Sequence, residues 1–250
     1  MEARPQRVLV LGATSAIAAE VALLHAARGA RLHLVGRNGA KLAEVAARCS
    51  GAEVTTQQAD LAALDGCADV VAAALEELGG VDVALIAHGD LGDQIAAEAS
   101  FEEAERIFRI NLLSAVALIV PLANHLEAAR GGTLAVISSV AGERGRPRND
   151  TYGAAKGALT LYLQGVRSRL FAAGVVVTTI KLGPVDTPMT VDHAKNLLFA
   201  TSPRVAAEIV AAIDAGAGEV YVPGFWRAIM PVVRNLPERV FQRLSFLSGR

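Results

Sequence analysis

Three residues of this chain have the types and spacing needed to move a proton. Tyr152 and Lys156 are four residues apart, and Ser139 lies 13 residues before the tyrosine. On a helix, residues four apart share one face, with about 6 Å between their Cβ atoms. A free tyrosine has a pKa of about 10, and a neighbouring ammonium group is expected to lower it. Such a tyrosine can exchange a proton with an alcohol or carbonyl oxygen that a serine hydroxyl also holds.

Interconversion of a carbonyl and an alcohol also needs a hydride carrier, which side chains do not supply. Residues 12–18 follow an aliphatic segment and open a predicted helix. Backbone N–H groups and the helix dipole at such a start can hold a pyrophosphate. A glycine-led turn between strand and helix is common, so this feature alone indicates a dinucleotide only weakly.

The elements that would position these residues alternate between strand and helix. Strands are predicted at residues 7–11, 31–35, 53–56, 81–87, 133–137, 175–181 and 219–221. Helices are predicted at residues 18–28, 41–49, 62–78, 101–126, 152–172 and 203–214. Continuous Val, Ile and Leu strands with helices between them imply a parallel sheet covered on both faces. We therefore predict the α/β class, with a single Rossmann-like, doubly wound parallel sheet and helices on both faces.

No repeat, low-complexity tract or change in composition divides the 250 residues. We interpret residues 1–223 as a dinucleotide-binding and catalytic domain, and residues 224–250 as an amphipathic C-terminal helical tail of the same domain. The apolar residues of the tail are interspersed with Arg227, Arg234, Arg239 and Arg243. A helix of this kind can lie in the bilayer interface, with its arginines at the headgroups. The alternative is that its apolar side packs on the domain or on a second subunit.

Composition excludes several classes of function. The net charge of −1 gives no electrostatic reason to bind nucleic acid. The longest apolar stretch, residues 112–123, is shorter than the about 20 residues of a membrane span, so we interpret it as a buried helix. Two cysteines and five histidines show no metal-ligand spacing, so we predict no metal site. No signal-peptide pattern opens the sequence, and we expect a cytoplasmic protein, with contact at the inner face of the membrane through the tail as a further expectation.

The motifs are the glycine-led turn at residue 12, Asn111, Ser139, the Tyr152–Lys156 pair and residues 183–187. They occur together and in this order along the chain, which makes the combination more specific than any one of them alone. In that combination the chain resembles the short-chain dehydrogenase/reductase family over essentially its whole length. The resemblance implies a catalytic group that consists of Asn111, Ser139, Tyr152 and Lys156, with Asn111 anchoring a water of the proton relay. It also implies a homo-oligomer, a dimer or a tetramer, because the family commonly pairs the helices at 101–126 and 152–172 across subunits.

The resemblance implies an NAD(P) cofactor held at the carboxyl ends of the strands. The candidate cofactor-binding residues are Gly12, Thr14, Ser15, Ala16, Ile17, Gly36, Arg37, Asp60, Leu61, Ala87, Gly89, Tyr152, Lys156, Gly183, Val185 and Thr187. In the family pattern, Asp60 and Leu61 face the adenine, Thr187 contacts the carboxamide, and Lys156 also holds the nicotinamide ribose.

Three departures from the family pattern bear on cofactor affinity. Ala16 and Ala18 replace two glycines, and each adds a methyl group where backbone and pyrophosphate approach closely. Residues 86–89 read Ile-Ala-His-Gly in place of Asn-Asn-Ala-Gly, and Leu182 replaces a proline. His88 is then either a histidine that packs the loop or a donor to the substrate.

The end of the second strand favours NADP(H) over NAD(H). An acidic residue there would accept the ribose hydroxyls and repel a 2′-phosphate. This chain has Gly36 and Arg37 instead, and arginine can pair bidentately with a phosphate. The alternative is that Arg37 is a solvated loop residue.

The sequence constrains the identity of the substrate less than it constrains the type of reaction. Arg144, Arg146 and Arg148 lie between the catalytic serine and tyrosine, and could pair with a phosphate or form a solvated basic loop. This loop and the tail resemble the decaprenylphosphoryl-2-keto-pentose reductases, which implies a lipid-linked keto-sugar substrate. A generic small ketone, a steroid or a 3-oxoacyl thioester is the alternative. From another class, a non-catalytic nucleotide-sensing or scaffold protein would use the same fold.

Overall fold

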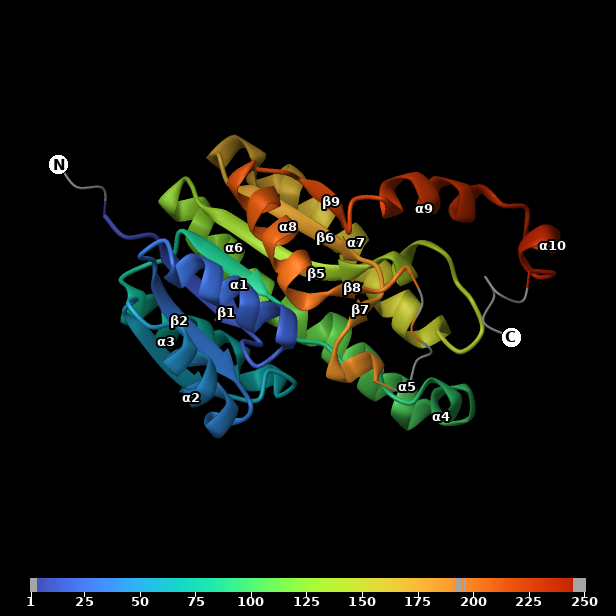
Figure 1. The fold of residues 1–250 in the computed structure, drawn as a ribbon, viewed down its shortest axis with the longest axis horizontal. Coiled ribbons are helices and arrows are strands. Elements are labelled where there is room, and N and C mark those ends of the chain that lie inside the picture. The colour runs from blue at the N-terminus through green and yellow to red at the C-terminus, as the bar shows by residue number, and fades with distance from the viewer. Residues whose placement is uncertain (1–3, 192–194, 196, 245–250) are drawn as a thin grey trace.

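The protein is described by a computed structural model that covers residues 4–191, 195 and 197–244 (Figure 1). Its centre is a parallel sheet of seven strands in the order β3-β2-β1-β4-β5-β6-β9. The strands are β1 (Arg7–Leu11), β2 (Arg31–Gly36), β3 (Val54–Gln58), β4 (Val83–Ile86), β5 (Thr133–Ser139), β6 (Val176–Leu182) and β9 (Glu219–Val222). The predicted α/β fold with a doubly wound parallel sheet is confirmed.

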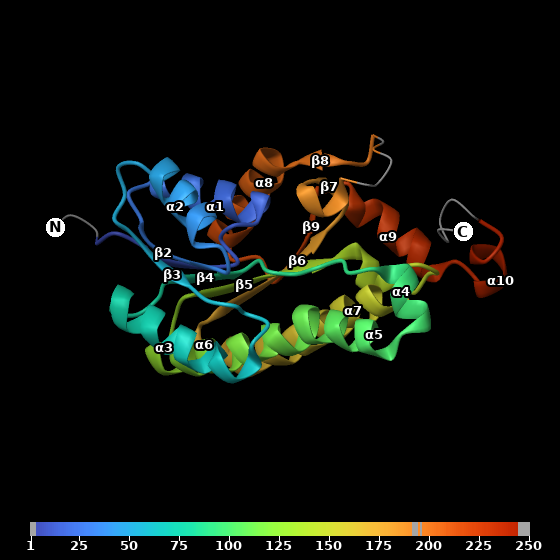
Figure 2. The same cartoon turned by 90° about the horizontal axis from the view of Figure 1, so that it is seen from below.

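Helices cover both faces of the sheet (Figure 2). One face carries α1 (Ala16–Ala26), α2 (Gly39–Arg48) and α8 (Ser202–Asp214), and the other carries α3 (Cys67–Leu78), α6 (Ser114–Ala129) and α7 (Asp150–Leu170). A separate hydrophobic cluster fills the space between the sheet and each helical layer. The central strands are apolar on both sides because both sides are buried. Short 3₁₀ turns are η1 (Leu64–Gly66), η3 (Val140–Glu143), η4 (Phe171–Ala173) and η5 (Pro188–Thr190).

The strand order reverses between β1 and β4, where open α/β sheets bind their ligands. The loops after these two strands touch. A Cβ atom built on Gly12 would lie 2.6 Å from the backbone nitrogen of His88, and Gly12 has a φ of +87°. Glycine is therefore required at this position both for space and for backbone conformation.

The chain between β4 and β5 is more divided than the single predicted helix at 101–126. A short helix, α4 (Gln94–Ala99), precedes it and is capped by the Asp93 side chain, which accepts from the amides of Ile95 and Ala96. The long segment then consists of α5 (Phe101–Phe108), a π-helical turn η2 (Arg109–Leu113) and α6. By length and composition the stretch Phe101–Ala129 could cross a membrane. Its α6 portion lies in the core, through residues such as Leu118 and Leu122, as predicted for a buried helix.

Two further elements differ from the prediction. After β6 the chain forms a small second sheet from β7 (Val185–Asp186) and β8 (Ala200–Thr201). The tail consists of two helices, α9 (Trp226–Asn235) and α10 (Glu238–Phe241), which extend at one end of the molecule (Figure 1). They are separated at Leu236, whose ψ of 130° is extended because Pro237 follows it. Residues 245–250 of the predicted tail lie outside the described residues.

Candidate active site

The predicted catalytic serine and tyrosine meet at the carboxyl end of β5. Ser139 is the last residue of β5, and Tyr152 lies in the first turn of α7. The Ser139 hydroxyl is close enough to the Tyr152 hydroxyl to act against the rise in the tyrosine pKa. The Ser139 hydroxyl is held in place by its own backbone contacts, since it accepts from the Ala141 amide at 3.1 Å and donates to the Leu182 carbonyl at 3.3 Å. Both hydroxyls can therefore form hydrogen bonds with the same substrate oxygen.

Lys156 lies one helical turn after the tyrosine, as its spacing predicts. Its Nζ atom is 5.9 Å from the centroid of the Tyr152 ring and donates to the carbonyl oxygen of Ile137 at 3.1 Å. The side chain is almost fully buried. The ammonium group is thus directed along the helix face toward the end of β5.

The pKa values in this site are governed mainly by burial. Burial raises the pKa of Tyr152 to about 12, the nearby Ser139 hydroxyl acts in the opposite direction, and the negative charge of Asp90 adds to the increase. Burial lowers the pKa of Lys156 to about 8. The predicted lowering of the tyrosine pKa by Lys156 is therefore wrong for this structure, because desolvation of the phenolate is the larger effect.

Asn111 lies in the π-helical turn between α5 and α6, buried against the loop after β4. Its Nδ2 donates to the carbonyls of Asp90 at 2.7 Å and Ile107 at 2.9 Å, and its Oδ1 accepts from the Asp90 amide at 3.1 Å. A Cβ atom built on Gly89 would lie 3.0 Å from the Asn111 Oδ1 and 3.5 Å from the Lys156 Nζ. The π-turn thus brings Asn111 to the same loop that passes beside Lys156, and such turns are frequent at functional sites.

His88 packs this loop against α6. Its Nε2 lies 2.6 Å from the Ser114 hydroxyl, which itself donates to the Ile110 carbonyl, so the histidine nitrogen is the donor. Burial lowers the pKa of His88 to about 4, and Lys156 lowers it further. Its neutral, hydrogen-bonded ring fits the loop-packing interpretation of this residue.

The loop after β1 fits the pyrophosphate of a dinucleotide. Ser15 is the N-cap of α1, and its side chain caps none of the first amides. Those amides and the helix dipole therefore point at the carboxyl edge of the sheet. Ala18 is fully buried in the core, so its methyl group packs between helix and strand. Ala16 is partly exposed at the helix start, and its methyl group is the one that would meet a cofactor.

The end of β2 lies beside this loop. A Cβ atom built on Gly36 would lie 3.2 Å from the Cγ2 of Thr14. Arg37 is exposed, and within the described residues its guanidinium forms no ion pair. The Asp60 carboxylate accepts from the Ala62 amide at 3.1 Å, which shapes the loop after β3.

The other predicted cofactor residues divide into core and edge positions. The side chains of Ile17, Leu61, Ala87 and Val185 belong to the hydrophobic core. Gly183 follows β6 and is covered by the indole of Trp226, so closely that a Cβ atom there would lie 1.9 Å from the indole nitrogen. Thr187 opens η5 in a reciprocal capping arrangement with Thr190. Thr187 also borders a shallow hollow with Asp186, Pro188, Val191 and Lys195.

The three arginines of the catalytic loop do not form one cluster. Arg144 pairs with Glu238 at 2.6 Å and stacks on Phe241 at 4.5 Å, both in the tail. Arg146 points at the Asn149 side chain, whose oxygen can accept from it at 3.0 Å. The tail is thus fastened to the catalytic loop, and its buried Trp226 and Phe241 pack on the domain.

Sequence reasoning missed three residues near the site. Asp90, in the loop after β4, pairs with Arg106 at 2.6 Å, and its negative charge raises the pKa of Tyr152. Glu143 and Lys181 form a buried ion pair beside the catalytic serine. Nothing in their local sequence pattern marks them, because each depends on a partner distant in the chain.

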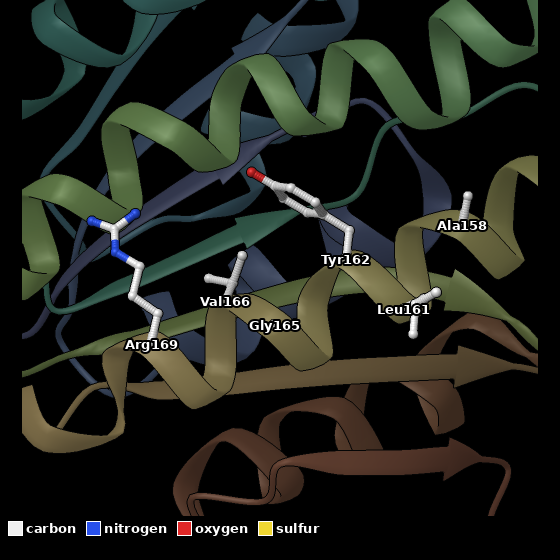
Figure 3. A pocket seen from close by; sticks show the side chains of 6 residues that line it. All are labelled: Ala158, Leu161, Tyr162, Gly165, Val166 and Arg169. Atoms are coloured by element: carbon white, nitrogen blue, oxygen red, sulfur yellow. The ribbon is translucent and has the colours of Figure 1, made fainter.

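A second hollow lies outside the catalytic group on the outer face of α7 (Figure 3). It is lined by Ala158, Leu161, Tyr162, Gly165, Val166 and Arg169. Leu161 is 68% exposed there. The described residues contain no group of three or more His, Cys, Asp or Glu side chains placed to hold a metal.

Comparison with known proteins places the chain in a family. The short chain dehydrogenase pattern matches residues 6–197. An uncharacterized oxidoreductase of Streptomyces coelicolor is 37% identical over 249 residues, covering 96% of both chains. An uncharacterized oxidoreductase of Mycobacterium tuberculosis is 35% identical over 240 residues, covering 95% of this chain and 96% of the relative.

Solved structures agree with the fold. A short chain dehydrogenase/reductase family protein covers 88% of this chain and 97% of its own, with a TM-score of 0.78 and 28% identity. The structure of levodione reductase matches 89% of this chain and 98% of its own chain, with a TM-score of 0.81 and 24% identity. A likeness at this identity supports the fold alone. The chain belongs to the short-chain dehydrogenase/reductase family and is a short-chain oxidoreductase, of a family that uses NAD(P) cofactors and small-molecule substrates.

Proposed function

We propose that this protein is an NADP(H)-dependent reductase or dehydrogenase that interconverts a carbonyl and an alcohol. The observation that carries the proposal is the grouping of Ser139, at the end of β5, with Tyr152 and with Lys156, whose Nζ lies 5.9 Å from the tyrosine ring one helical turn away. A bound nicotinamide would supply or accept the hydride. The side chains then have the remaining task of handling the proton.

The roles of the four residues follow from their positions. Tyr152 donates its proton to the developing alkoxide in reduction and takes it back in oxidation. Ser139 donates a hydrogen bond to the same oxygen, which requires it to exchange its bond to the Leu182 carbonyl. Lys156 would hold the nicotinamide ribose hydroxyls, and its ammonium group favours the phenolate as the proton leaves. Asn111 orders the loop beside Lys156, where a water relay to solvent would begin.

The preference for NADP(H) rests on Arg37. Its guanidinium is exposed at the end of β2 next to Gly36, with no acidic side chain at that position. The test is titration of the purified protein with NADPH and NADH, followed by nicotinamide fluorescence. We expect NADPH to bind at least tenfold more tightly, which is about 1.4 kcal/mol.

The control for this titration is the variant Arg37→Ala. It should lose the preference while binding NADH as before, because only the contact with the 2′-phosphate is removed. An unchanged preference in Arg37→Ala would assign the discrimination to other residues. Failure of the wild-type protein to bind either nucleotide would favour the non-catalytic, nucleotide-sensing or scaffold function instead.

For the substrate we propose a lipid-linked keto-sugar, with a generic small ketone, a steroid or a 3-oxoacyl thioester as the second candidate. The first is supported by the resemblance of the arginine loop and tail to keto-pentose reductases, and by the contact between these two segments. The steroid alternative has support from a hydroxysteroid 11-beta-dehydrogenase 1-like protein of Xenopus tropicalis, 29% identical over 231 residues. Turnover of a polyprenyl-phosphoryl keto-sugar against a panel of steroids and 3-oxoacyl thioesters separates the candidates.

The cellular setting is also a proposal. A cytoplasmic homo-oligomer, a dimer or tetramer joined through the outer faces of α6 and α7, fits the exposed apolar side chains there. Contact of the tail with the inner face of the membrane would use Phe225, Val232 and Val240, which are exposed. Co-flotation with anionic vesicles, compared with a variant carrying serine at these three positions, tests that contact.

A further inference from the structure

The short turn η3 lies between the catalytic serine and the catalytic helix. It begins directly after Ser139 and packs on α7 through backbone atoms. A Cβ atom built on Gly142 would lie 2.5 Å from the amide nitrogen of Gly157, and one built on Gly153 would lie 2.8 Å from the Ala141 carbonyl oxygen. Side chains larger than hydrogen are excluded from this contact.

These contacts fall beside the catalytic residues of the helix. Gly153 directly follows Tyr152, and Gly157 directly follows Lys156. Backbone packed this closely transmits a displacement instead of absorbing it. The position of η3 therefore sets the position of Ser139 relative to the tyrosine and the lysine.

A buried ionic network fixes the far end of η3 to the sheet. Glu143, the last residue of the turn, accepts from the Lys181 ammonium group and, at 2.7 Å, from the Tyr221 hydroxyl. Lys181 also donates to Glu219 at 2.7 Å. The side chains of Glu143 and Lys181 are 6% and 5% exposed. In the sheet register, Lys181 pairs with Ser138 on one side and Tyr221 on the other.

Such a network is a costly way to join a turn to a sheet. Two buried charges lose their hydration, and an apolar pair of similar size is often as stabilising. The second oxygen of Glu143, Oε2, is buried and has no hydrogen-bond partner within the described part of the chain. Unlike an apolar contact, a charge-assisted hydrogen bond is directional, so each bond restricts the position of the Glu143 carboxylate.

We propose that Glu143 is a positioning residue for Ser139. Held by Lys181 and Tyr221, it keeps η3 against α7, so that the serine hydroxyl meets the oxygen that Tyr152 protonates. This inference rests on the proposed carbonyl–alcohol reaction and extends it to residues outside the catalytic group.

The test is a double-mutant cycle between Glu143→Gln and Ser139→Ala, with NADPH and a reducible ketone. We expect Glu143→Gln to lower kcat at least tenfold while the Kd for NADPH changes less than twofold. In the Ser139→Ala background the same substitution should cost less than twofold, because the group it positions is gone. Tyr221→Phe, which removes one hydroxyl, should show the same pattern with a smaller effect.

A matched control is a second buried hydrogen bond, which joins α7 to β6, the strand that carries Lys181. Thr179 of β6 is buried and accepts from Arg167 of α7 at 2.6 Å, at the end of α7 away from the serine. Thr179→Val removes a comparable buried hydrogen bond and should leave kcat within twofold. A full loss of kcat from Glu143→Gln that persists in Ser139→Ala would overturn the proposal, and so would an equal loss from Thr179→Val.

A second readout does not need turnover. Amide hydrogen exchange in residues 140–143 should rise at least fivefold in Glu143→Gln, and should be unchanged in Thr179→Val. Unchanged exchange in both variants would overturn the inference even in an active enzyme. Absence of turnover in the wild-type protein, with the exchange pattern as expected, would instead count against the proposed reaction while the tethering of η3 stood.

Discussion

At the scale of single residues, burial shifts the pKa of each titratable group of the site toward its neutral form. Burial keeps Tyr152 protonated to about pH 12 and brings the pKa of Lys156 down to about 8. The proton is therefore present on the tyrosine at neutral pH, where a reductase needs it.

Substitution Tyr152→Phe tests the role of the tyrosine. It removes one hydroxyl and keeps the ring, so the Kd for NADPH should stay within twofold of the wild-type value. The rate should fall by about 100-fold or more, the usual size of a general acid contribution. Single-turnover kinetics together with nucleotide titration measure both quantities, and a rate within tenfold of wild type would assign the proton to another group.

The pKa of Lys156 makes a prediction about stability and pH. Its pKa is about 8 in the folded chain and 10.5 in the reference state. Between these values the unfolded chain binds more protons, so stability rises with pH, by up to about 1.4 kcal/mol per pH unit. Urea unfolding from pH 7 to 10.5 should show this rise in the wild-type protein relative to Lys156→Met. Parallel curves for the two proteins would contradict the lowered pKa.

At the scale of elements, three loops and one tail meet at the carboxyl edge of the sheet. The loop after β4 contacts both the loop after β1 and the π-turn, so the cofactor side and the proton side share one segment. The tail contacts the loop after β5 through Arg144. The tail is therefore joined to the loop that connects Ser139 with Tyr152.

Substitution Arg144→Ala should release α10. It removes the ion pair with Glu238 and the stacking on Phe241, which together are worth about 1–2 kcal/mol at a half-buried site. Amide exchange in residues 238–242 should accelerate roughly tenfold, with little change in the core. The control is Arg239→Ala, which removes an equal charge from an exposed position of α10. Equal acceleration in both variants would mean that charge alone, and not the contact, holds the helix.

At the scale of the whole molecule, the outer face of α6 and α7 presents apolar side chains to solvent. Leu161 is 68% exposed, and Phe171 just after α7 is 81% exposed. Exposed apolar groups on adjacent helices are typical of a protein–protein interface. Leu161 is exposed whereas Lys156 of the same helix is buried, so subunits could associate on this face without covering the candidate site.

Substitution Leu161→Arg tests that interface. The wild-type protein should have the mass of a dimer or tetramer in size-exclusion chromatography with light scattering. Leu161→Arg should shift it to a smaller species, because a charge would be buried at the contact. Ile95→Arg, at an exposed apolar residue of α4, is the matched control and should not. A monomeric wild-type protein would contradict the predicted oligomer.

The sequence alone determined the fold class and supplied the catalytic group that we propose. Continuous aliphatic strands can only be buried on both faces, and the spacing of Tyr152 and Lys156 places them on one side of any helix. These are local properties of period and composition. They survive small errors in boundaries, such as the third strand, which was predicted at 53–56 and runs over Val54–Gln58.

The tertiary structure decided what depends on distant partners. Six-residue α4 and two-stranded β7-β8 are too short for periodicity to reveal, and the π-turn at Asn111 has no sequence signature. The sequence predicted a lowered pKa for Tyr152, but burial by the surrounding chain raised it. Likewise, the ion pair of Glu143 with Lys181 joins residues that are 38 positions apart. Arg144 forms an ion pair with Glu238 of the tail, which the sequence of the loop alone does not predict. Desolvation and long-range contact are set by packing, which no local pattern encodes.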